Sequence, residues 1–257
     1  MKPAGRSSQA AGRRFTPVAD LKVKLYADGA QVAEMLELRA KPFIRGFTTN
    51  PTLMRKAGVN DYRQFAQEVL AAIPDRPISF EVISDDLAEM ERQARAIATW
   101  GRCVFVKIPI TNTRGRPCYE LIHRLSHDGI RVNVTAVLTL EQVERAAFAL
   151  RGGAPSNISV FAGRIADTGR DPVPMVTKAL GMLDEPQMEL IWASPRELLN
   201  VFQADAAGCH IITITGDLLK KLDLVGKDLV ELSLDTVKMF RDDAVTAGFT
   251  LKDVPLP

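Results

Sequence analysis

The stretch VFVKIP, residues 104–109, places one ionisable amine, Lys107, among apolar and β-branched side chains. A run of this kind that ends in proline is typical of a buried parallel strand. An unpaired ammonium is costly to bury, and one escape is the loss of its proton, which leaves a neutral nucleophile. The chemistry that a neutral amine offers is the formation of an imine, or Schiff base, with a carbonyl substrate.

An imine-forming lysine has two requirements. Its surroundings must disfavour the charged form of the amine, and neighbouring groups must transfer protons. In water, a lysine with a pKa of about 10.4 is neutral in only about one molecule in 2,500 at pH 7. Proton transfers into and out of the carbinolamine also need an acid or base that works near the operating pH. Two carboxylates, Asp28 and Glu81, and a threonine hydroxyl are candidates for this task. The alternative for Lys107 is a buried ion pair with Asp28 or Glu81.

Polar side chains stand near the ends of several apolar runs. They are Asp28, Thr48, Thr49, Asn50, Glu81, Lys107, Asn133, Thr135, Ser159 and Ser194. Because the C-terminal ends of the strands of a parallel barrel meet at one face, we expect these side chains to share one space. Simpler interpretations exist for Asp28 and Ser194 as helix caps, and for Asn50 before a proline as turn chemistry. Glu81 is harder to explain in this way, because the segment SFEVI surrounds it with apolar neighbours.

Two arginines predict a binding site for an anion. Arg164 follows the run NISVFAG, and Arg196 lies in SPRE, where Ser194 and Glu197 form a capping-box pattern with proline at the first helical position. Free amides at a helix N-terminus, a serine hydroxyl and two guanidinium groups are suited to phosphate. Two ordinary surface arginines are the alternative.

Metal and nucleotide motifs are weak in this sequence. His123 and His127 have the i, i+4 spacing of metal ligands, but no HExxH motif or carboxylate partner accompanies them. We therefore interpret them as part of a solvated helix face. The sequence contains no P-loop and no GxGxxG, so we expect no cofactor and no metal.

Eight β-like runs would position the candidate residues. They are residues 23–28, 46–51, 78–83, 104–109, 131–137, 157–163, 189–194 and 210–215. Helical stretches separate them, and successive runs begin 21 to 32 residues apart. This alternation predicts parallel βαβ units of an α/β protein, and eight such units predict one (β/α)8 TIM barrel. An open doubly wound sheet is the competing arrangement.

Helix signals support the alternation. Ser84 opens a segment whose residues Leu87, Met90, Ala94 and Ile97 fall on one face. Thr139 and Gln142 form a capping box ahead of Val143, Ala146 and Leu150. Residues 227–247 read as an additional C-terminal helix that packs across the barrel or against another subunit, so a homo-oligomer is left open.

The composition fits a soluble globular protein. With 33 basic and 31 acidic residues, the net charge of +2 gives no reason to expect nucleic acid or a membrane surface as a partner. Three widely spaced cysteines outside any CxxC pattern favour free thiols and a cytoplasmic location. We expect residues 1–20 to be a mobile basic tail and residues 21–257 to form the barrel with its C-terminal helix.

Taken together, these segments resemble the transaldolase family, including its fructose-6-phosphate-aldolase-like branch, over residues 23–245. GFTTNPTLM looks like the TTNPS segment of the family, VFVKIPIT like the strand of its Schiff-base lysine, and ISVFAGRIAD like its SPFVGR segment. WASPRELLN and AGCHIITIT resemble its late Ser/Arg helix and its final strand.

The resemblance implies sugar-phosphate substrates and a role for each matching residue. Lys107 would form the imine, Asp28 would be the nearest acid and base, and Glu81 with Thr135 would hold a proton-carrying water. Substrate hydroxyls and phosphate would be bound by Thr49, Asn50, Asn133, Ser159, Phe161, Arg164, Ser194 and Arg196.

Two positions bear on the kind of reaction. The resemblance implies a group-transfer enzyme, because this sequence has Glu81 and Phe161 at positions where the aldolase branch tends to have Gln and Tyr. This sequence departs from the family at Gly29, Thr52 and Val160, which leaves the donor and acceptor sugars open. An aldolase that releases dihydroxyacetone and a non-catalytic sugar-phosphate-binding protein are the competing functions.

Overall fold

The computed structural model describes residues 16–250 of the chain. Within them, Thr16–Leu222 form one compact unit, and the segment from Asp223 onward belongs to a second. Of the predicted mobile tail, residues 1–20, positions 1–15 lie outside the described residues. The end of this segment is described: Val18–Asp20 form a 3-10 turn, and Val18 packs against the barrel core.

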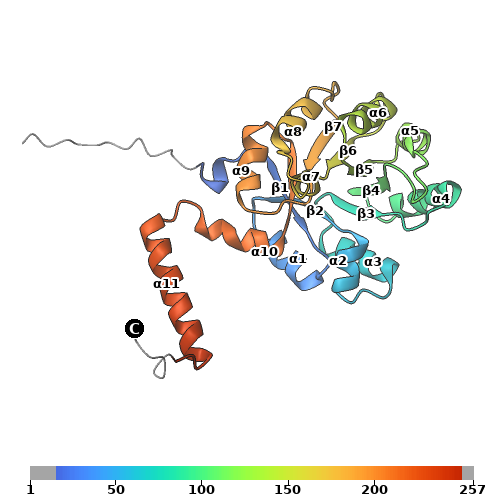
Figure 1. Ribbon diagram of the computed structural model, residues 1–257. Coiled ribbons are helices and arrows are strands. Elements are labelled where there is room, and N and C mark those ends of the chain that lie inside the picture. Colours follow the sequence, from blue (N-terminus) through green and yellow to red (C-terminus); the bar gives the residue numbers. More distant parts are fainter. Residues whose placement is uncertain (1–15, 251–257) are drawn as a thin grey trace, which may run out of the picture. The chain divides into compact units, whose positions relative to one another are not determined.

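The larger unit is a closed barrel of parallel strands in the order β1 to β8, each paired with its neighbours in sequence (Figure 1). The strands are β1 Lys24–Asp28, β2 Ile44–Thr48, β3 Ile78–Glu81, β4 Val104–Pro109, β5 Val132–Val137, β6 Ser156–Val160, β7 Met188–Trp192 and β8 Ile211–Thr215. β1 pairs with β8, which closes the sheet. The predicted (β/α)8 barrel is therefore confirmed, and the competing prediction of an open doubly wound sheet is wrong.

Helices follow the strands and cover the outside of the barrel (Figure 1). They are α1 Val32–Arg39, α2 Pro51–Lys56, α3 Tyr62–Ala72, α4 Leu87–Ala98, α5 Tyr119–His127, α6 Leu140–Leu150, α7 Ala162–Ala166, α8 Val173–Leu180, α9 Leu199–Ala206 and α10 Gly216–Leu219. The capping box of Thr139 and Gln142 is present at the start of α6. The helix predicted from Ser84 begins at Leu87 instead, because the Asp86 side chain caps it by accepting a hydrogen bond from Glu89 N–H.

The core divides between the two faces of the sheet. Most buried apolar side chains, such as Val106 and Ile108 on β4, lie between the strands and the helices. A smaller cluster of Tyr26, Ile191, Ala193 and Ile211 is separate from them. Because side chains alternate along a strand, these positions face the barrel interior, as do the polar residues two positions further on.

A glycine makes room for the largest side chain of the interior. A β-carbon at Gly46 on β2 would lie 2.5 Å from the ring of Tyr26, closer than such atoms approach. The two strands shift in register beside this contact, between Leu25 and Tyr26. The ring of Tyr26 can therefore fill the interior below the polar end of the barrel.

The second unit contains α11, Leu229–Thr246, close to the predicted 227–247. Asp228 caps it by accepting hydrogen bonds from Val230 N–H and Glu231 N–H. Its apolar side chains are exposed, with Val237 at 61% and Phe240 at 63%. No helix in residues 16–250 is both long and apolar enough to cross a membrane.

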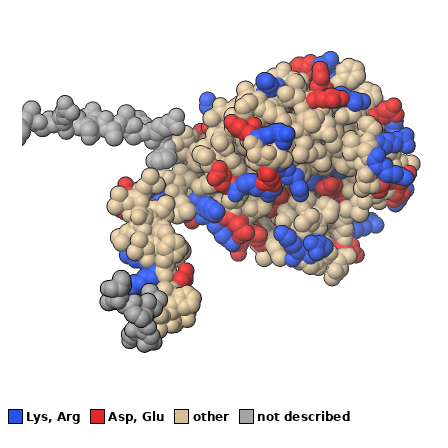
Figure 2. Space-filling view, in the orientation of Figure 1, with Lys and Arg blue, Asp and Glu red and all other residues tan. Residues whose placement is uncertain are grey.

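Charged side chains of both signs are interspersed over the face of the larger unit seen in Figure 2. Several charged side chains of this unit pair, as Glu91 does with Arg95 and Arg124. This mixture agrees with the small net charge of the sequence.

Candidate active site

A cavity of about 500 Å³ opens at the C-terminal ends of the strands. The predicted residues that line it are Asp28, Asn50, Glu81, Lys107, Asn133, Thr135, Ser159, Phe161, Arg164, Ser194 and Arg196. They come from seven different strands or the loops that follow them. The closed barrel brings them together because all its strands point the same way.

Lys107 reaches the cavity from the middle of β4. Its side chain is only 7% exposed, and its Nζ lies 3.1 Å from Glu81 Oε2. Nζ also donates a hydrogen bond of 2.8 Å to the carbonyl oxygen of Thr49. Glu81 and Lys107 are register partners on β3 and β4, so adjacent strands present both side chains to the same space. The alternative of a buried ion pair is thus present in the structure, and it lies inside the cavity.

Asp28 ends β1 at the edge of the same cavity. Thr48 Oγ1 donates a hydrogen bond of 2.7 Å to Asp28 Oδ1, and Asn50 Nδ2 donates one of 3.5 Å to Oδ2. Burial raises the pKa of Asp28 above its ordinary value of 3.8, while the charge of Lys107 and these hydrogen bonds oppose the rise. Asp28 does not cap α1, whose N-cap residue is Gln31.

The TTNP turn after β2 serves both structure and site. Asn50 caps α2, because its Oδ1 accepts a hydrogen bond of 3.0 Å from Leu53 N–H. Its Nδ2 faces Asp28. The Thr49 side chain is outside the set that lines the cavity: it is fully buried, and its hydroxyl donates to the carbonyl oxygen of Ser79. Thr49 contacts the amine of Lys107 through its backbone alone.

Neighbouring interior positions on β5 and β6 hold one another. Ser159 Oγ donates a hydrogen bond of 2.7 Å to Asn133 Oδ1, and Asn133 Nδ2 donates one of 3.1 Å to Ser79 Oγ. Both Asn133 and Ser159 are buried, and Thr135 lies two positions beyond Asn133 with 2% exposure. Their side chains therefore have fixed orientations before any substrate enters.

Arg164 and Arg196 lie at the same end of the cavity as Phe161. The guanidinium of Arg164 lies 5.9 Å from the centre of the Phe161 ring. Arg196 makes a two-pronged ion pair with Asp167, in which Nε donates to Oδ1 at 2.9 Å and Nη2 donates to Oδ2. These hydrogen bonds lower the pKa of Asp167. The pair fixes the plane of the guanidinium while leaving other N–H groups available.

The predicted helix is present, but its predicted start at Ser194 is wrong. Ser194 has φ of 61°, in the left-handed region, whereas an N-cap residue is extended. The next helix, α9, begins only at Leu199. Instead, Asn200 Oδ1 accepts hydrogen bonds from Arg196 N–H at 2.8 Å and from Glu197 N–H at 3.2 Å. Arg196 therefore lies in an irregular turn that a side-chain amide stabilises.

Sequence reasoning missed several residues that line the cavity. Among them are Lys56, Thr213 and Thr215, whereas Thr48, which was expected in this space, does line it. The alternation of threonine with isoleucine in HIITIT was a visible signal for the two on β8, since alternate residues share a face. Lys56 ends α2, and nothing in its spacing pointed to the cavity.

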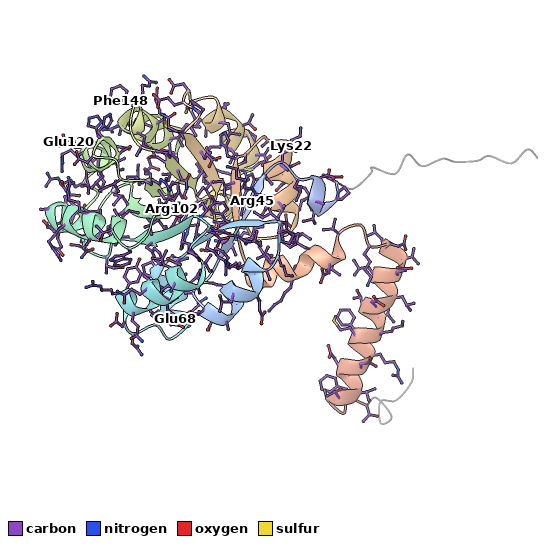
Figure 3. All side chains as sticks on the ribbon, turned by 180° about the vertical axis from the view of Figure 1, so that it is seen from behind. Lys22, Arg45, Glu68, Arg102, Glu120 and Phe148 are labelled. Carbon is purple, nitrogen blue, oxygen red and sulfur yellow. The ribbon has the colours of Figure 1, made fainter. Side chains whose placement is uncertain are left out.

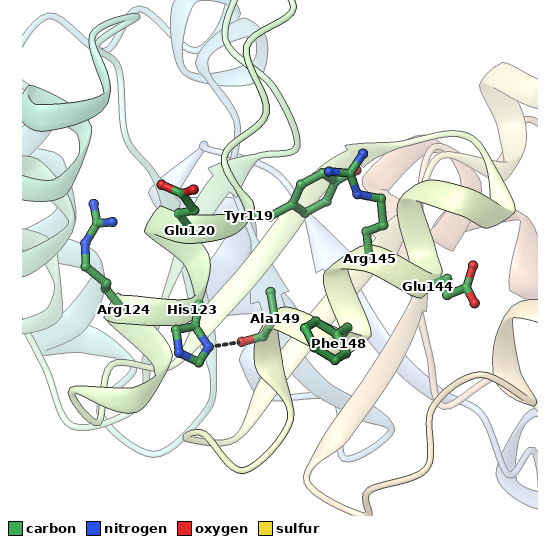
Figure 4. A pocket seen from close by; sticks show the side chains of 8 residues that line it. All are labelled: Tyr119, Glu120, His123, Arg124, Glu144, Arg145, Phe148 and Ala149. Carbon is green, nitrogen blue, oxygen red and sulfur yellow. Dashed lines mark hydrogen bonds between the residues drawn. The ribbon is translucent and has the colours of Figure 1, made fainter.

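A larger hollow of about 760 Å³ lies on the outside, between α5 and α6 (Figure 4). Glu120 and Phe148, which line it, mark those outer helices in Figure 3. Here His123 Nδ1 lies 3.1 Å from the carbonyl oxygen of Ala149, and its ring is 3.9 Å from that of His127. Residues 16–250 contain no group of three or more side chains suited to hold a metal ion. Acids and arginines line this hollow too, but no lysine does, so it offers no amine like that of Lys107 in the barrel cavity.

Comparisons with known structures support the fold. The chain is similar to the crystal structure of 2,3-dimethylmalate lyase, a PEP mutase/isocitrate lyase superfamily member, with a TM-score of 0.52 and 13% identity over 93% of this chain and 89% of that one. It is also similar to a putative lyase/mutase from Burkholderia cenocepacia J2315, with a TM-score of 0.55 and 13% identity over 92% and 88% of the two chains. At such low identity, these likenesses concern the fold alone.

Sequence comparisons are more specific. Residues 25–251 match the family model described as Transaldolase/Fructose-6-phosphate aldolase. A probable transaldolase of Dehalococcoides mccartyi is 34% identical over 202 residues, covering 78% of this chain and 90% of the relative. A probable transaldolase of Thermoanaerobacter sp. is 34% identical over 231 residues, covering 89% and 100%. The chain therefore belongs to the transaldolase/fructose-6-phosphate aldolase family.

Proposed function

We propose that this protein is a transaldolase that moves a three-carbon dihydroxyacetone unit between sugar phosphates through an imine on Lys107. The observation that carries the proposal is the position of Lys107 Nζ, which is buried in the barrel cavity 3.1 Å from the carboxylate of Glu81. An amine in such a place can attack a carbonyl, and a proton acceptor lies within hydrogen-bond distance.

Imine formation would use both acids. Lys107 Nζ adds to the ketose carbonyl carbon, the amine passes a proton to Glu81, directly or through a water held with Thr135, and the carbonyl oxygen takes a proton from Asp28 to become the carbinolamine hydroxyl. Glu81 then returns its proton to this hydroxyl, which leaves as water and gives a protonated imine, with both carboxylates ionised. Glu81 and Thr135 line the cavity together with Lys107, so no long movement is required.

The protonated imine then acts as an electron sink. Asp28 takes the proton of the substrate C4 hydroxyl, the electron pair of the C3–C4 bond moves to the imine nitrogen, and an aldose phosphate leaves with a new carbonyl. The enamine carbon attacks the acceptor aldehyde, whose oxygen takes the proton back from Asp28, and water releases the product. Because burial raises the pKa of Asp28, this group is suited to both accept and donate a proton.

Fixed polar groups would orient the two substrates. Asn50, Asn133 and Ser159 can bind sugar hydroxyls, since their side chains line the cavity. Arg164, Ser194 and Arg196 would hold the phosphate, since all three line the cavity and the charges of both arginines act on Asp167. The Asp167 carboxylate holds Arg196 in place for this role.

A borohydride experiment tests the proposal. The protein is incubated with fructose 6-phosphate, reduced, digested and analysed by mass spectrometry for a three-carbon or six-carbon adduct on the peptide with Lys107. We expect the adduct on Lys107 and on no other lysine. Absence of an adduct with a range of ketose donors would favour a non-catalytic binding protein.

Addition of erythrose 4-phosphate distinguishes transfer from cleavage. A transferase forms a seven-carbon ketose phosphate, whereas an aldolase releases free dihydroxyacetone even without the acceptor. Release of dihydroxyacetone faster than transfer would favour the aldolase.

Phe161→Tyr tests the group that separates these two outcomes. Phe161 lines the cavity without a hydroxyl, and a phenol there can hold a water or donate a proton to the enamine carbon. We expect the variant to release more dihydroxyacetone per transfer than the parent protein. An unchanged product ratio would contradict this use of Phe161.

A further inference from the structure

Tyr62, the first residue of α3, holds the main chain of Glu81. Its phenol oxygen accepts a hydrogen bond of 2.7 Å from Glu81 N–H and donates one of 3.0 Å to the Glu81 carbonyl oxygen. One side chain thus satisfies both main-chain groups on one edge of Glu81. The carboxylate of the same residue lies 3.1 Å from Lys107 Nζ.

The barrel wall needs such a contact because β2 leaves β3 early. The two strands pair at only two positions, Phe47 with Ile78 and Thr48 with Ser79. The last ladder hydrogen bond runs from Thr49 N–H to the Ser79 carbonyl oxygen at 3.2 Å, and the chain then turns into α2. The edge of β3 beyond this point has no strand beside it.

The opposite edge of β3 remains paired. There Val82 N–H donates a hydrogen bond of 3.2 Å to the Lys107 carbonyl oxygen, so β3 and β4 stay together past Glu81. Main-chain groups away from water need partners on both edges. The Tyr62 hydroxyl takes the place of the strand that β2 does not supply.

The ring of Tyr62 is itself fixed by aromatic packing. It lies 5.6 Å from the Trp100 ring in an edge-to-face arrangement and 6.2 Å from the Phe80 ring. Burial raises the pKa of Tyr62, so the phenol keeps the proton that it donates to Glu81. A rigid side chain of this kind holds its hydroxyl at one position.

We propose that Tyr62 is a positioning residue, whose hydroxyl fixes the Glu81 main chain so that the carboxylate stays at hydrogen-bond distance from Lys107. Tyr62 is outside the set that lines the barrel cavity, so it acts through Glu81. The kinetic part of this proposal rests on the proposed function, since it requires Glu81 to take part in imine formation.

Amide hydrogen exchange tests the geometry without any need for activity. In Tyr62→Phe, the ring and its packing remain while the acceptor of Glu81 N–H is lost. We expect exchange at Glu81 N–H to become at least about tenfold faster. Val82 N–H, which is bonded to the Lys107 carbonyl oxygen, is the internal control and should exchange as before. Unchanged exchange at Glu81 would overturn the proposal.

The rate of borohydride trapping tests the consequence for chemistry. We expect Tyr62→Phe to lower the rate of imine formation about tenfold, the effect of losing two ordinary hydrogen bonds, while the KM for fructose 6-phosphate changes little. Tyr119→Phe is the matched control, because Tyr119 packs its ring under Arg145 in the hollow between α5 and α6 and does not line the barrel cavity. It should trap at the parental rate.

A double variant separates positioning from a general structural effect. If Tyr62 acts through Glu81, then adding Tyr62→Phe to Glu81→Gln should not slow trapping further. A second tenfold loss in the double variant would overturn the proposal. If the parent protein itself forms no adduct, the proposed transaldolase function fails, and the exchange at Glu81 N–H still decides whether Tyr62 holds this residue.

Discussion

The carbonyl oxygen of Ser194 lies so close to Gly163 that a β-carbon added there would stand 1.5 Å from it. Gly163 belongs to α7, directly before Arg164, and Ser194 precedes Arg196 by two positions. Gly163 N–H also lies 3.4 Å from the carbonyl oxygen of Ala193. The two loops that carry the proposed phosphate-binding arginines therefore touch at a glycine.

Gly163→Ala should weaken the binding of phosphorylated substrates. The methyl group must push the loops apart, and displaced arginines cannot both reach one phosphate. We expect the KM for fructose 6-phosphate to rise at least about tenfold, since misplacement by about 1 Å is enough to lose much of the benefit of orientation. Trapping of unphosphorylated dihydroxyacetone on Lys107 should change less, because its site does not need the arginines.

Gly181→Ala is the matched control for this substitution. A β-carbon at Gly181 would make only an ordinary contact of 3.5 Å with the Lys178 carbonyl oxygen, and its φ of −69° suits alanine. The control should keep the parental KM. An equal loss in both variants, or a parental KM in Gly163→Ala, would contradict the role of the Gly163 contact.

Asp28→Asn should stabilise the protein at neutral pH while removing activity. Burial raises the pKa of Asp28 in the folded protein above 3.8, so the unfolded chain ionises first as the pH rises. The stability that comes from the protonated carboxyl is therefore present below about pH 4 and is lost as the pH rises through the folded-state pKa. The loss amounts to about 1.4 kcal/mol for each pH unit between the two pKa values.

Urea unfolding between pH 4.5 and 8 measures this effect. The free energy of unfolding of Asp28→Asn should exceed that of the parent protein, and the difference should grow with pH until Asp28 is ionised in the fold. Asp223→Asn, at an exposed position, should show no such growth. A difference that shrinks with rising pH would contradict the raised pKa.

Lys107→Met should abolish the adduct and change the titration of Asp28. The positive charge of Lys107 lowers the pKa of Asp28, so its removal should raise that pKa further. Carbon-13 NMR of labelled aspartate carboxyl groups follows this titration directly. Lys24→Met, which removes the partner of Glu189 at the opposite, N-terminal end of β1, should leave Asp28 unchanged. A lower pKa of Asp28 in Lys107→Met would contradict the coupling.

The sequence predicted the barrel because its strongest signals are local and repeated. VFVKIP matches β4 residue for residue, and the capping box at Thr139 fixes the start of α6. Strand ends were less accurate: the run 157–163 includes Ala162 and Gly163, which belong to α7. Apolar runs do not mark where a buried strand turns into a buried helix, because both are hydrophobic.

The sequence predicted which residues share the candidate site, but it did not predict how they contact one another. Strand-end polarity found Lys107 and Glu81, since neighbouring parallel strands align their ends. The same signal also selected Thr49, whose side chain turns into the wall to bond Ser79. The left-handed turn at Ser194 and the contact of Tyr62 with Glu81 depend on tertiary packing. No local propensity encodes them.

Thiol labelling should find one reactive cysteine in the folded protein. Burial raises the pKa of Cys118 to about 11 and that of Cys209 to about 12, whereas Cys103 is only partly buried. The thiolate is the reactive form, and a thiol with a pKa of about 11 is ionised in only about one molecule in a thousand at pH 8. We therefore expect a disulfide reagent to modify Cys103 within minutes and the other two only as the barrel opens. In denaturant, all three cysteines should react. Fast modification of Cys118 or Cys209 in the native protein would contradict the prediction, because it would show that the wall around β4, β5 and β8 opens far more often than its packing implies.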